Sequence, residues 1–445
     1  MTEADFAVLA LLVLGWAVVS GVLARRNITG PLVFAAAGYL LGNPDWGPLS
    51  VDVETSSVHA LAEVTLALVL FSDAARVNIA RLRHDLSLPV RLLAVGLPLS
   101  VALGGLLAAW LLGDLTWALA GFVGAALAPT DAALSVQVIN DERIPTRLRR
   151  TLNVESGLND GIATPIVTFM VAVAASQIGV TSESEPYEAG TALRELGGGV
   201  LVGLAIGVLA AALLTAAARR GWVATGGRRF ATLAAALAAF ALALATGGNG
   251  FIAAFVAGIS YGAMLGDDVV DIEEAGELTE LGGEVLALAV WFLFGATLVP
   301  VAFEFFDVPV VVYAVLSLTI VRMLPVAVCL FRSGLDWRSI VFVGWFGPRG
   351  LASVVFALVA LEELGETSPV VGKSVAVVAL TVLLSVVLHG VTAGPGGRRY
   401  VQGEQPEAAP DGVPRARPIA FSSTDDDAGT APVEPSSGHG PTTSE

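Results

Sequence analysis

Ala-Pro-Thr-Asp at residues 128–131 and Glu-Ser-Gly-Leu-Asn-Asp-Gly at residues 155–161 are two polar clusters inside otherwise apolar segments of membrane-spanning length. An ionised carboxylate at the depth of a bilayer is costly to bury, so acids in such segments usually line a cavity and have a function there. Two neighbouring segments that hold three acids, with Asn, Ser and Thr beside them, therefore indicate a site for a small cation or for protons.

The composition is that of a polytopic membrane protein. Of the 445 residues, 55% are hydrophobic and only 14% are charged, and the mean hydropathy is +0.75. Soluble domains carry about 25% charged residues. The single cysteine, Cys329, excludes an internal disulfide and argues against a cysteine-based metal site.

Several classes of partner and chemistry are not expected. The net charge is −16, and Lys373 is the only lysine, which does not describe a nucleic-acid-binding protein. The sequence has no phosphate-binding glycine loop and no nucleophile elbow, and its four histidines lack metal-ligand spacing. We therefore expect membrane lipid as the surroundings, and no nucleotide, no cofactor and no enzymatic activity.

Hydropathy predicts an all-α protein with about thirteen transmembrane helices, since a span needs about 20 mainly apolar residues. The chain divides at charged or Gly/Pro-rich breaks into runs near 6–23, 31–43, 58–78, 88–112, 116–138, 150–176, 196–218, 229–246, 249–265, 278–298, 308–331, 338–362 and 372–393. The opening run spans by itself and lacks a basic leader, so we interpret it as the first helix and not as a signal peptide.

Arginine-rich loops orient these spans, because short cytoplasmic loops accumulate Arg and Lys. The arginines follow odd-numbered spans: Arg25 and Arg26; Arg76, Arg81, Arg83 and Arg91; Arg143, Arg147, Arg149 and Arg150; Arg219, Arg220, Arg228 and Arg229; Arg332 and Arg338; Arg398 and Arg399. One odd loop, 267–284, is strongly acidic instead. The pattern predicts a multi-pass cell-membrane protein with its N-terminus outside and its C-terminus in the cytoplasm.

Two interrupted spans predict an inverted repeat. Span 5 is broken at Pro129-Thr130, and span 12 is broken at Gly347-Pro348-Arg349-Gly350. If residues 1–176 and 229–393 are six-helix repeats joined by a connector helix at 196–218, each break falls in the fifth helix of its repeat. Matched breaks of this kind indicate the substrate site of a secondary transporter. Residues 394–445, rich in Pro, Gly, Ser and acids, are expected to form a disordered acidic cytoplasmic tail.

Helical spacing separates the acids of span 6. Ser156 and Asp160 are four residues apart and differ by about 40° around an ideal helix, whereas Glu155 and Asp160 differ by about 140°. We therefore assign Ser156 and Asp160 to a cation cavity that faces Thr130 and Asp131. Glu155 then points elsewhere, and a buried arginine is the economical partner for it.

The candidate arginines are Arg349 and Arg322, and the sequence does not choose between them. Arg349 is also suited to neutralise the free carbonyl ends of the broken helices, as Asp131 is suited to complement their amide ends or to bind a cation. Glu63 in span 3 could reach the cavity directly or through water. Asp73, close to Arg76, is as consistent with a solvated surface residue as with a funnel residue.

At these residues the chain resembles the cation:proton antiporters, in the sodium/proton exchanger branch with an Asn-Asp pair in its sixth helix. The resemblance rests on Pro129-Thr130-Asp131, on residues 155–161 and on Gly347-Pro348-Arg349-Gly350, with Glu63 and Arg322 in support, and it extends over about residues 1–393. One departure is Gly157, where many members of the family carry a bulkier apolar residue.

The resemblance implies crossed broken helices 5 and 12, a core domain beside a dimerisation domain, a homodimer and elevator-type alternating access. It implies an ion site of Asp160, Asp131, Ser156, Thr130 and Glu63, with sodium held by the first four. The uncharged Asn159 separates this branch from electrogenic members of the family, which implies exchange of one ion for one proton.

The function predicted is therefore antiport of sodium, or lithium, against protons, with a role in pH homeostasis. A potassium/proton antiporter is the alternative, because a few cavity oxygens decide selectivity. Two remote alternatives are a cation channel, which would not require paired breaks, and an intramembrane aspartyl protease, which would use Asp131 and Asp160. Those two aspartates lack the sequence contexts expected of that protease class.

Overall fold

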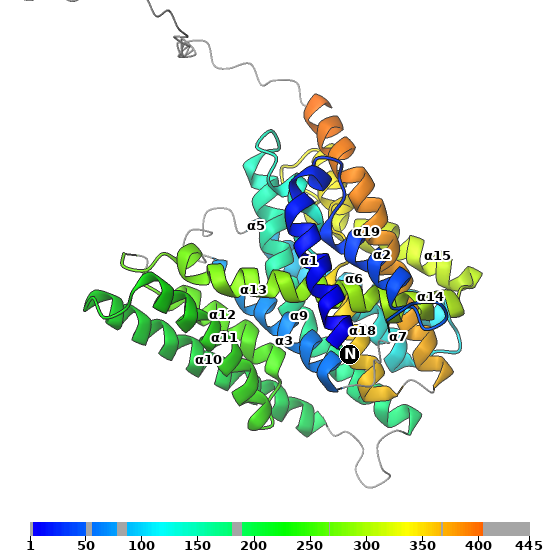
Figure 1. Cartoon of the computed structure of the whole chain (residues 1–445). Coiled ribbons are helices and arrows are strands. Elements are labelled where there is room, and N and C mark those ends of the chain that lie inside the picture. The colour runs from blue at the N-terminus through cyan, green and yellow to red at the C-terminus, as the bar shows by residue number, and fades with distance from the viewer. Residues whose placement is uncertain are drawn as a thin grey trace, which may run out of the picture. The chain divides into compact units, whose positions relative to one another are not determined.

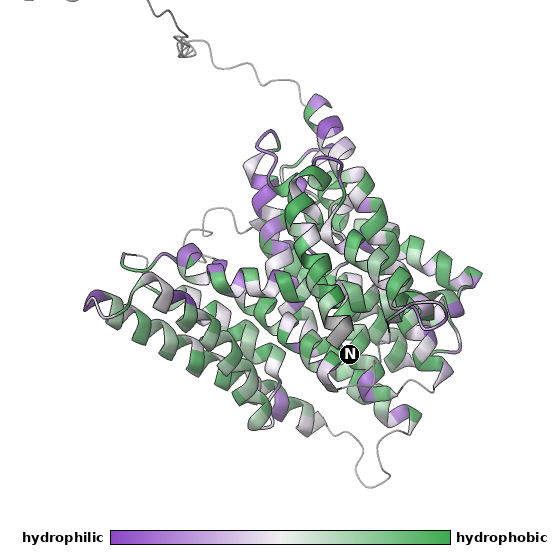
Figure 2. Ribbon diagram, viewed as in Figure 1, coloured by the Kyte–Doolittle hydropathy of each residue, from purple (hydrophilic) through white to green (hydrophobic). Residues whose placement is uncertain are grey.

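The computed structural model describes residues 3–49, 56–77, 87–179, 189–266, 268–365 and 368–403. These ranges contain helices and connecting segments and no strand (Figure 1). They belong to one compact unit, Met1–Gly403. Figure 2 shows apolar residues along most of the helices, with hydrophilic residues gathered near helix ends and in loops. The prediction of an all-helical, multi-pass membrane fold is confirmed.

The elements in chain order are α1 (Glu3–Ala24), α2 (Gly30–Leu41), α3 (Ser56–Arg76), α5 (Ser87–Arg91), η1 (Leu92–Gly96), α6 (Leu97–Leu111), α7 (Trp117–Ala126), η2 (Ala133–Ser135), α8 (Val136–Ile139), α9 (Thr146–Ile178), α10 (Ala189–Arg219), α11 (Thr225–Ala245), α12 (Gly250–Met264), α13 (Ile272–Leu293), η3 (Phe294–Leu298), α14 (Val299–Glu304), α15 (Val308–Leu316), η4 (Ser317–Val321), α16 (Arg322–Leu330), α17 (Trp337–Trp345), α18 (Leu351–Leu364) and α19 (Pro369–Gly403). Three of them, η1, η3 and η4, are π-turns inside longer helices.

Every predicted span contains one helix or two or three helix pieces. In the described part of the chain, nine helices are long and apolar enough to cross a membrane alone, and three apolar helices, α2, α7 and α12, are shorter. The run predicted at 278–298 is longer than expected, because α13, η3 and α14 continue one another over 272–304. The count of thirteen spans and the inverted repeat stay predictions.

The two predicted breaks are present, and they meet. Helix α7 ends at Ala126 and leaves irregular backbone before η2, while α17 ends at Trp345 and α18 begins at Leu351. The amide of Asp131 in the first break donates to the carbonyl of Pro348 in the second at 2.8 Å. A proline removes one backbone donor in each segment, which favours a break there, although α9 and α19 continue through Pro165 and Pro395.

The helices pack in two groups. The peripheral group, α3 and α10–α13, has α12 against both α10 and α3; the site group contains α6, α7, α9 and α15–α19 (Figure 1). The two groups meet where α3 and α12 contact α9 and where α3 and α13 contact α18. Gly161 of α9 lies so close to the Phe255 ring of α12 that any larger residue there would clash with it.

Four acids of the stretch 267–284, which departed from the loop pattern, pair with arginines from neighbouring helices. Its ion pairs are Asp268 with Arg219 at 3.4 Å, Glu274 with Arg228 at 3.4 Å, Glu277 with Arg229, and Glu280 with Arg76. Most of this stretch belongs to α13 rather than to a loop. The exception therefore has a structural reason, because the acids serve as partners for arginines of α3, α10 and α11.

The tail begins later than the sequence predicted. Helix α19 continues past residue 394 to Gly403, despite Pro395 within it. Tyr400 explains the extension, because its ring packs at 4.4 Å on Phe342 of α17 and its hydroxyl lies 2.7 Å from the Ser339 hydroxyl. The remaining residues of the predicted disordered tail, 404–445, lie outside the described residues.

Candidate functional site

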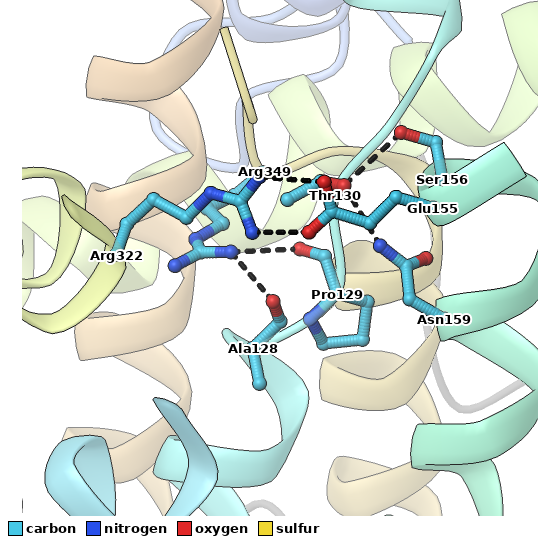
Figure 3. A network of polar contacts seen from close by, with 8 residues as sticks. All are labelled: Ala128, Pro129, Thr130, Glu155, Ser156, Asn159, Arg322 and Arg349. Carbon is cyan, nitrogen blue, oxygen red and sulfur yellow. Dashed lines mark hydrogen bonds and ion pairs between the residues drawn. The ribbon is translucent and has the colours of Figure 1, made fainter. Parts of the chain in front are cut away.

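Arg349 crosses from the second break to the carbonyl oxygens of the first. Its Nη1 donates to the carbonyl of Ala128 at 2.6 Å and to that of Pro129 at 3.1 Å, and the residue is fully buried (Figure 3). These carbonyls follow the end of α7, where helix geometry supplies no amide partner and the helix dipole is negative. The guanidinium therefore stabilises the end of the first half-helix.

Asp131 does the reverse for the second break. One carboxylate oxygen accepts from the amide of Leu351, the first residue of α18, at 3.0 Å, and the other accepts from the amide of Ala133 at 2.8 Å. A carboxylate is favourable at a helix N-terminus because it complements the positive end of the dipole. Gly350 makes the approach possible, because a Cβ atom there would collide with the Asp131 side chain.

Glu155 and Arg322 form a buried, two-pronged ion pair. The Nη1–Oε1 distance is 2.5 Å and the Nη2–Oε2 distance is 3.0 Å, and the side chains are 6% and 4% exposed for Arg322 and Glu155 (Figure 3). Arg322 follows the π-turn η4, and its guanidinium lies against Gly347, where any side chain would displace it. The sequence left two arginines open as partners of Glu155, and the structure places Arg322 there.

Thr130, Ser156 and Asn159 form a hydrogen-bonded group between the first break and α9. The hydroxyl oxygens of Thr130 and Ser156 lie 3.0 Å apart, and the Asn159 amide nitrogen donates to Thr130 Oγ1 at 2.7 Å. All three residues are buried. Asn159 therefore positions Thr130 by donating a hydrogen bond to it, and Asn159 adds no charge to the site.

Asp160 is different from the other acids of the site. It is half-buried, one helical turn beyond Ser156 on α9, and within electrostatic reach of Asp131 and Asp73. Within the described ranges no hydrogen bond or ion pair engages its carboxylate, whereas Glu155 and Asp131 are each committed to partners. Among the acids of α9 and the first break, Asp160 is therefore the one whose carboxylate is available to bind a cation or a proton.

Asp73 belongs to the site, although the sequence did not decide between surface and funnel for it. The Asp73 side chain faces Gly157 of α9, whose Cβ position is 3.6 Å from Asp73 Cβ. Gly157, the departure from the family pattern, leaves space beside this acid, and that departure was the available signal. Asp73 adds a carboxylate from the peripheral group to those of the site group.

Glu63 lies elsewhere. Ten residues separate it from Asp73 along α3, a rise of about 15 Å. Its charged neighbours are Glu362 and Glu363 at the end of α18, and His59, one turn before Glu63 on α3, pairs with Glu362 at 3.0 Å. The structure therefore places Glu63 near the acids at that end of the bundle, and its part in the ion site, directly or through water, stays a prediction.

A further set of contacts from α19 holds the second break. The Arg349 amide donates to Ser385 Oγ at 2.7 Å, and that hydroxyl lies 3.3 Å from His389 Nδ1. His389 Nε2 lies 2.8 Å from the carbonyl of Trp345, the last residue of α17, and the His389 and Trp345 rings stack at 5.2 Å. His389 Nδ1 also lies 2.9 Å from the Ser385 carbonyl, so each ring nitrogen faces a carbonyl acceptor. Sequence reasoning missed His389, because its relevance depends on tertiary contacts.

Comparisons with known proteins match most of this chain. The family model described as "Sodium/hydrogen exchanger, transmembrane" matches residues 8–397. The chain is 26% identical over 359 residues to the K(+)/H(+) antiporter NhaP2 of Shewanella baltica, covering 79% of this chain and 60% of that protein. It is 26% identical over 330 residues to the K(+)/H(+) antiporter NhaP of Alkalimonas amylolytica, covering 74% and 55%. The chain thus spans little more than half the length of these curated relatives.

Among solved structures, the chain is similar to the sodium proton antiporter MjNhaP1 from Methanocaldococcus jannaschii at pH 8. The TM-score is 0.71 with 20% sequence identity, over 90% of this chain and 99% of that one. This likeness supports the fold.

The Glu155–Arg322 pair predicts a stability difference between single and double substitutions. Removing one partner of a buried pair leaves an uncompensated charge and costs about 3–5 kcal/mol. We expect Glu155→Leu alone to lower the melting temperature of the detergent-solubilised protein strongly, and Glu155→Leu with Arg322→Met to recover most of the loss. Arg143→Met, which removes a surface pair with Asp141, is the control and should change stability by less than about 1 kcal/mol. Additive losses in the double variant would contradict the pairing.

His389 predicts a second contrast. His389→Leu removes one partner each from the Trp345 carbonyl and the Ser385 hydroxyl, which keep the amides of Gly347 and Arg349, so the expected loss is about 1 kcal/mol, the net contribution of a hydrogen bond. His389→Gln retains an N–H that can donate to the Trp345 carbonyl. We expect the melting temperature to fall clearly for the Leu variant and to be largely restored in the Gln variant. Equal melting temperatures for the two variants would show that the hydrogen bond to Trp345 is unimportant.

Proposed function

The chain belongs to the sodium/hydrogen exchanger family, and we propose that it exchanges a monovalent cation for protons across the membrane. The observation that carries the proposal is the uncommitted carboxylate of Asp160 beside the crossed breaks, next to Asp131, Asp73 and the hydroxyls of Thr130 and Ser156. Carboxylate and hydroxyl oxygens are hard ligands suited to alkali cations, as they are to other hard cations.

Competition between a cation and a proton for Asp160 couples the transport of one to the transport of the other. The carboxylate can hold a cation or a proton, and the two exclude each other from the same oxygens. If the site is exposed to the other side of the membrane only when it is occupied, each crossing carries one of them. Exchange then follows from the two gradients alone, by alternating access that we propose to be of the elevator type, with the site group moving against the peripheral group.

Sodium, or lithium, is the cation we propose, and potassium is the alternative. The sodium proposal follows from the family motifs, while the names of the Shewanella and Alkalimonas relatives favour potassium. The ligand atoms are of the same kind in both cases, so selectivity depends on the spacing of a few oxygens. A transport assay with each cation in turn distinguishes a sodium or lithium exchanger from a potassium exchanger.

We propose an electroneutral exchange of one cation for one proton. Glu155 is neutralised by Arg322, and Asn159 carries no charge and donates to Thr130. Asp131 has both oxygens bound to backbone amides, which also argues against its use by an aspartyl protease. Asp160 and Asp73 remain, and we propose that Asp160 changes occupant while Asp73 keeps its charge throughout the cycle.

The surroundings we propose are the cell membrane and a homodimer. Leu11, Leu14 and Val18 of α1 are 65%, 60% and 78% exposed, so α1 presents an apolar face to lipid or to a second subunit. The arginine pattern favours an N-terminus outside and a C-terminus in the cytoplasm. Cation/proton exchange in that membrane would serve pH homeostasis.

Asp160→Asn tests the site directly, because it keeps the side-chain shape and removes the exchangeable proton. We expect sodium-, lithium- or potassium-driven proton movement in proteoliposomes, followed with a pH-sensitive dye, to fall to the level of empty vesicles. Asp141→Asn, in an acid outside the site, is the control and should transport like the wild type. Transport by Asp160→Asn at a near-normal rate would refute the assignment.

Voltage independence tests the stoichiometry. One uncompensated charge would couple exchange to the membrane potential by about 2.3 kcal/mol per 100 mV. We expect the equilibrium cation distribution in vesicles to be unchanged when the potential is clamped with potassium and valinomycin, once potassium is shown not to be transported. If potassium is a substrate, a gradient of a membrane-permeant anion sets the potential instead, with the pH buffered on both sides. A distribution that follows the imposed voltage would show that a second charge moves.

A further inference from the structure

Arg76 lies beside the proposed cation site without being bound to it. It is in the last turn of α3, three residues after Asp73, so the two side chains share a face of the helix. The Arg76 charge acts on the Asp73 carboxylate, yet no hydrogen bond joins the two residues in the part of the chain that the structure describes. Arg76 is paired instead with Glu280 of α13.

The Arg76–Glu280 pair is not needed to hold its helices together. Each side chain is 37% exposed, and ion pairs with that exposure contribute little to stability. Helices α3 and α13 also pack directly, with Gly283 against Leu68 and Val69. The position of the pair, next to Asp73, is therefore its distinguishing property.

A neighbouring ion pair on α13 provides a comparison for the Arg76–Glu280 pair. Glu277 pairs with Arg229 of α11, one turn before Glu280, and these side chains are 47% and 38% exposed. That pair has the same chemistry and similar exposure, but Arg229 comes from α11 and not from the helix that carries Asp73. If both ion pairs only stabilised the packing of α13, replacing Glu277 and replacing Glu280 would have similar effects.

We propose that Glu280 is a positioning residue for cation affinity, because it holds the Arg76 guanidinium away from Asp73. Released from Glu280, the guanidinium can turn toward Asp73 and compete with the transported cation as a tethered positive charge. A unit charge that moves several ångströms closer to a partly dehydrated site weakens cation binding several-fold. The inference rests on the proposed function, since it concerns the affinity of the same site.

The experiment measures the apparent KM and the maximal rate for the cation in proteoliposomes, at an alkaline pH where protons no longer compete for the site. Glu280→Gln should raise KM about five- to tenfold with little change in maximal rate, and Arg76→Gln should lower KM. In the double variant, Glu280→Gln should have no further effect, because the tethered charge is gone. A loss of structure would instead reduce the maximal rate and the amount of folded protein.

Glu277→Gln and Arg229→Gln are the matched controls, and we expect KM within twofold of wild type for both. The proposal is overturned if Glu277→Gln raises KM as much as Glu280→Gln, or if Glu280→Gln raises KM equally with and without Arg76. The second result would mean that the carboxylate acts by its own charge. Wild-type protein that shows no cation-driven proton movement would instead overturn the proposed function, so the two failures are distinguishable.

Discussion

The structure depends on the need to satisfy backbone groups at the depth of the membrane. In hydrocarbon an unpaired amide or carbonyl costs several kilocalories per mole, so irregular backbone is tolerated only where protein groups or a polar cavity compensate it. The crossing of the two breaks meets this need by exchange: Arg349 of the second binds carbonyls of the first, and Asp131 of the first binds amides of the second. Without the other break, each break would leave its own charged side chain, Asp131 or Arg349, buried without these partners.

This exchange also determines which acid is available for transport. Arg349 and Asp131 compensate helix ends, and Arg322 compensates Glu155. Asp160 and Asp73 have no such partner among the described residues, and the charge of Asp160, on α9 one turn beyond Ser156, must therefore be met by something that enters. Burial makes an empty ionised state unfavourable, which is why an occupant, cation or proton, is expected before the site moves.

Sequence reasoning reached the breaks, the polar clusters and the angular separation of Glu155 from Asp160, because proline chemistry and helical periodicity are local properties. It could not choose between Arg322 and Arg349 as partner of Glu155, since that depends on how α16 and α18 cross. It could not tell how far Glu63 lies from the cavity, because that distance depends on how α3 packs against its neighbours. His389 was missed for the same reason: an interior histidine reveals its role only through the carbonyl that it faces.

Apart from the contact between His59 of α3 and Glu362 of α18, the ion pairs follow the division into two groups of helices. Pairs in the site group join α16 to α9, and α19 to the loop before α7, while pairs in the peripheral group join α3, α10 and α11 to the stretch 267–284. Between the groups, α9 meets α3 and α12 through Gly157 and Gly161. Asp73 and Asp160 come from opposite sides of this boundary, so a cation held by both would bind the two groups to each other. Its replacement by a proton on Asp160 would remove that link, which relates occupancy of the site to the freedom of the groups to move.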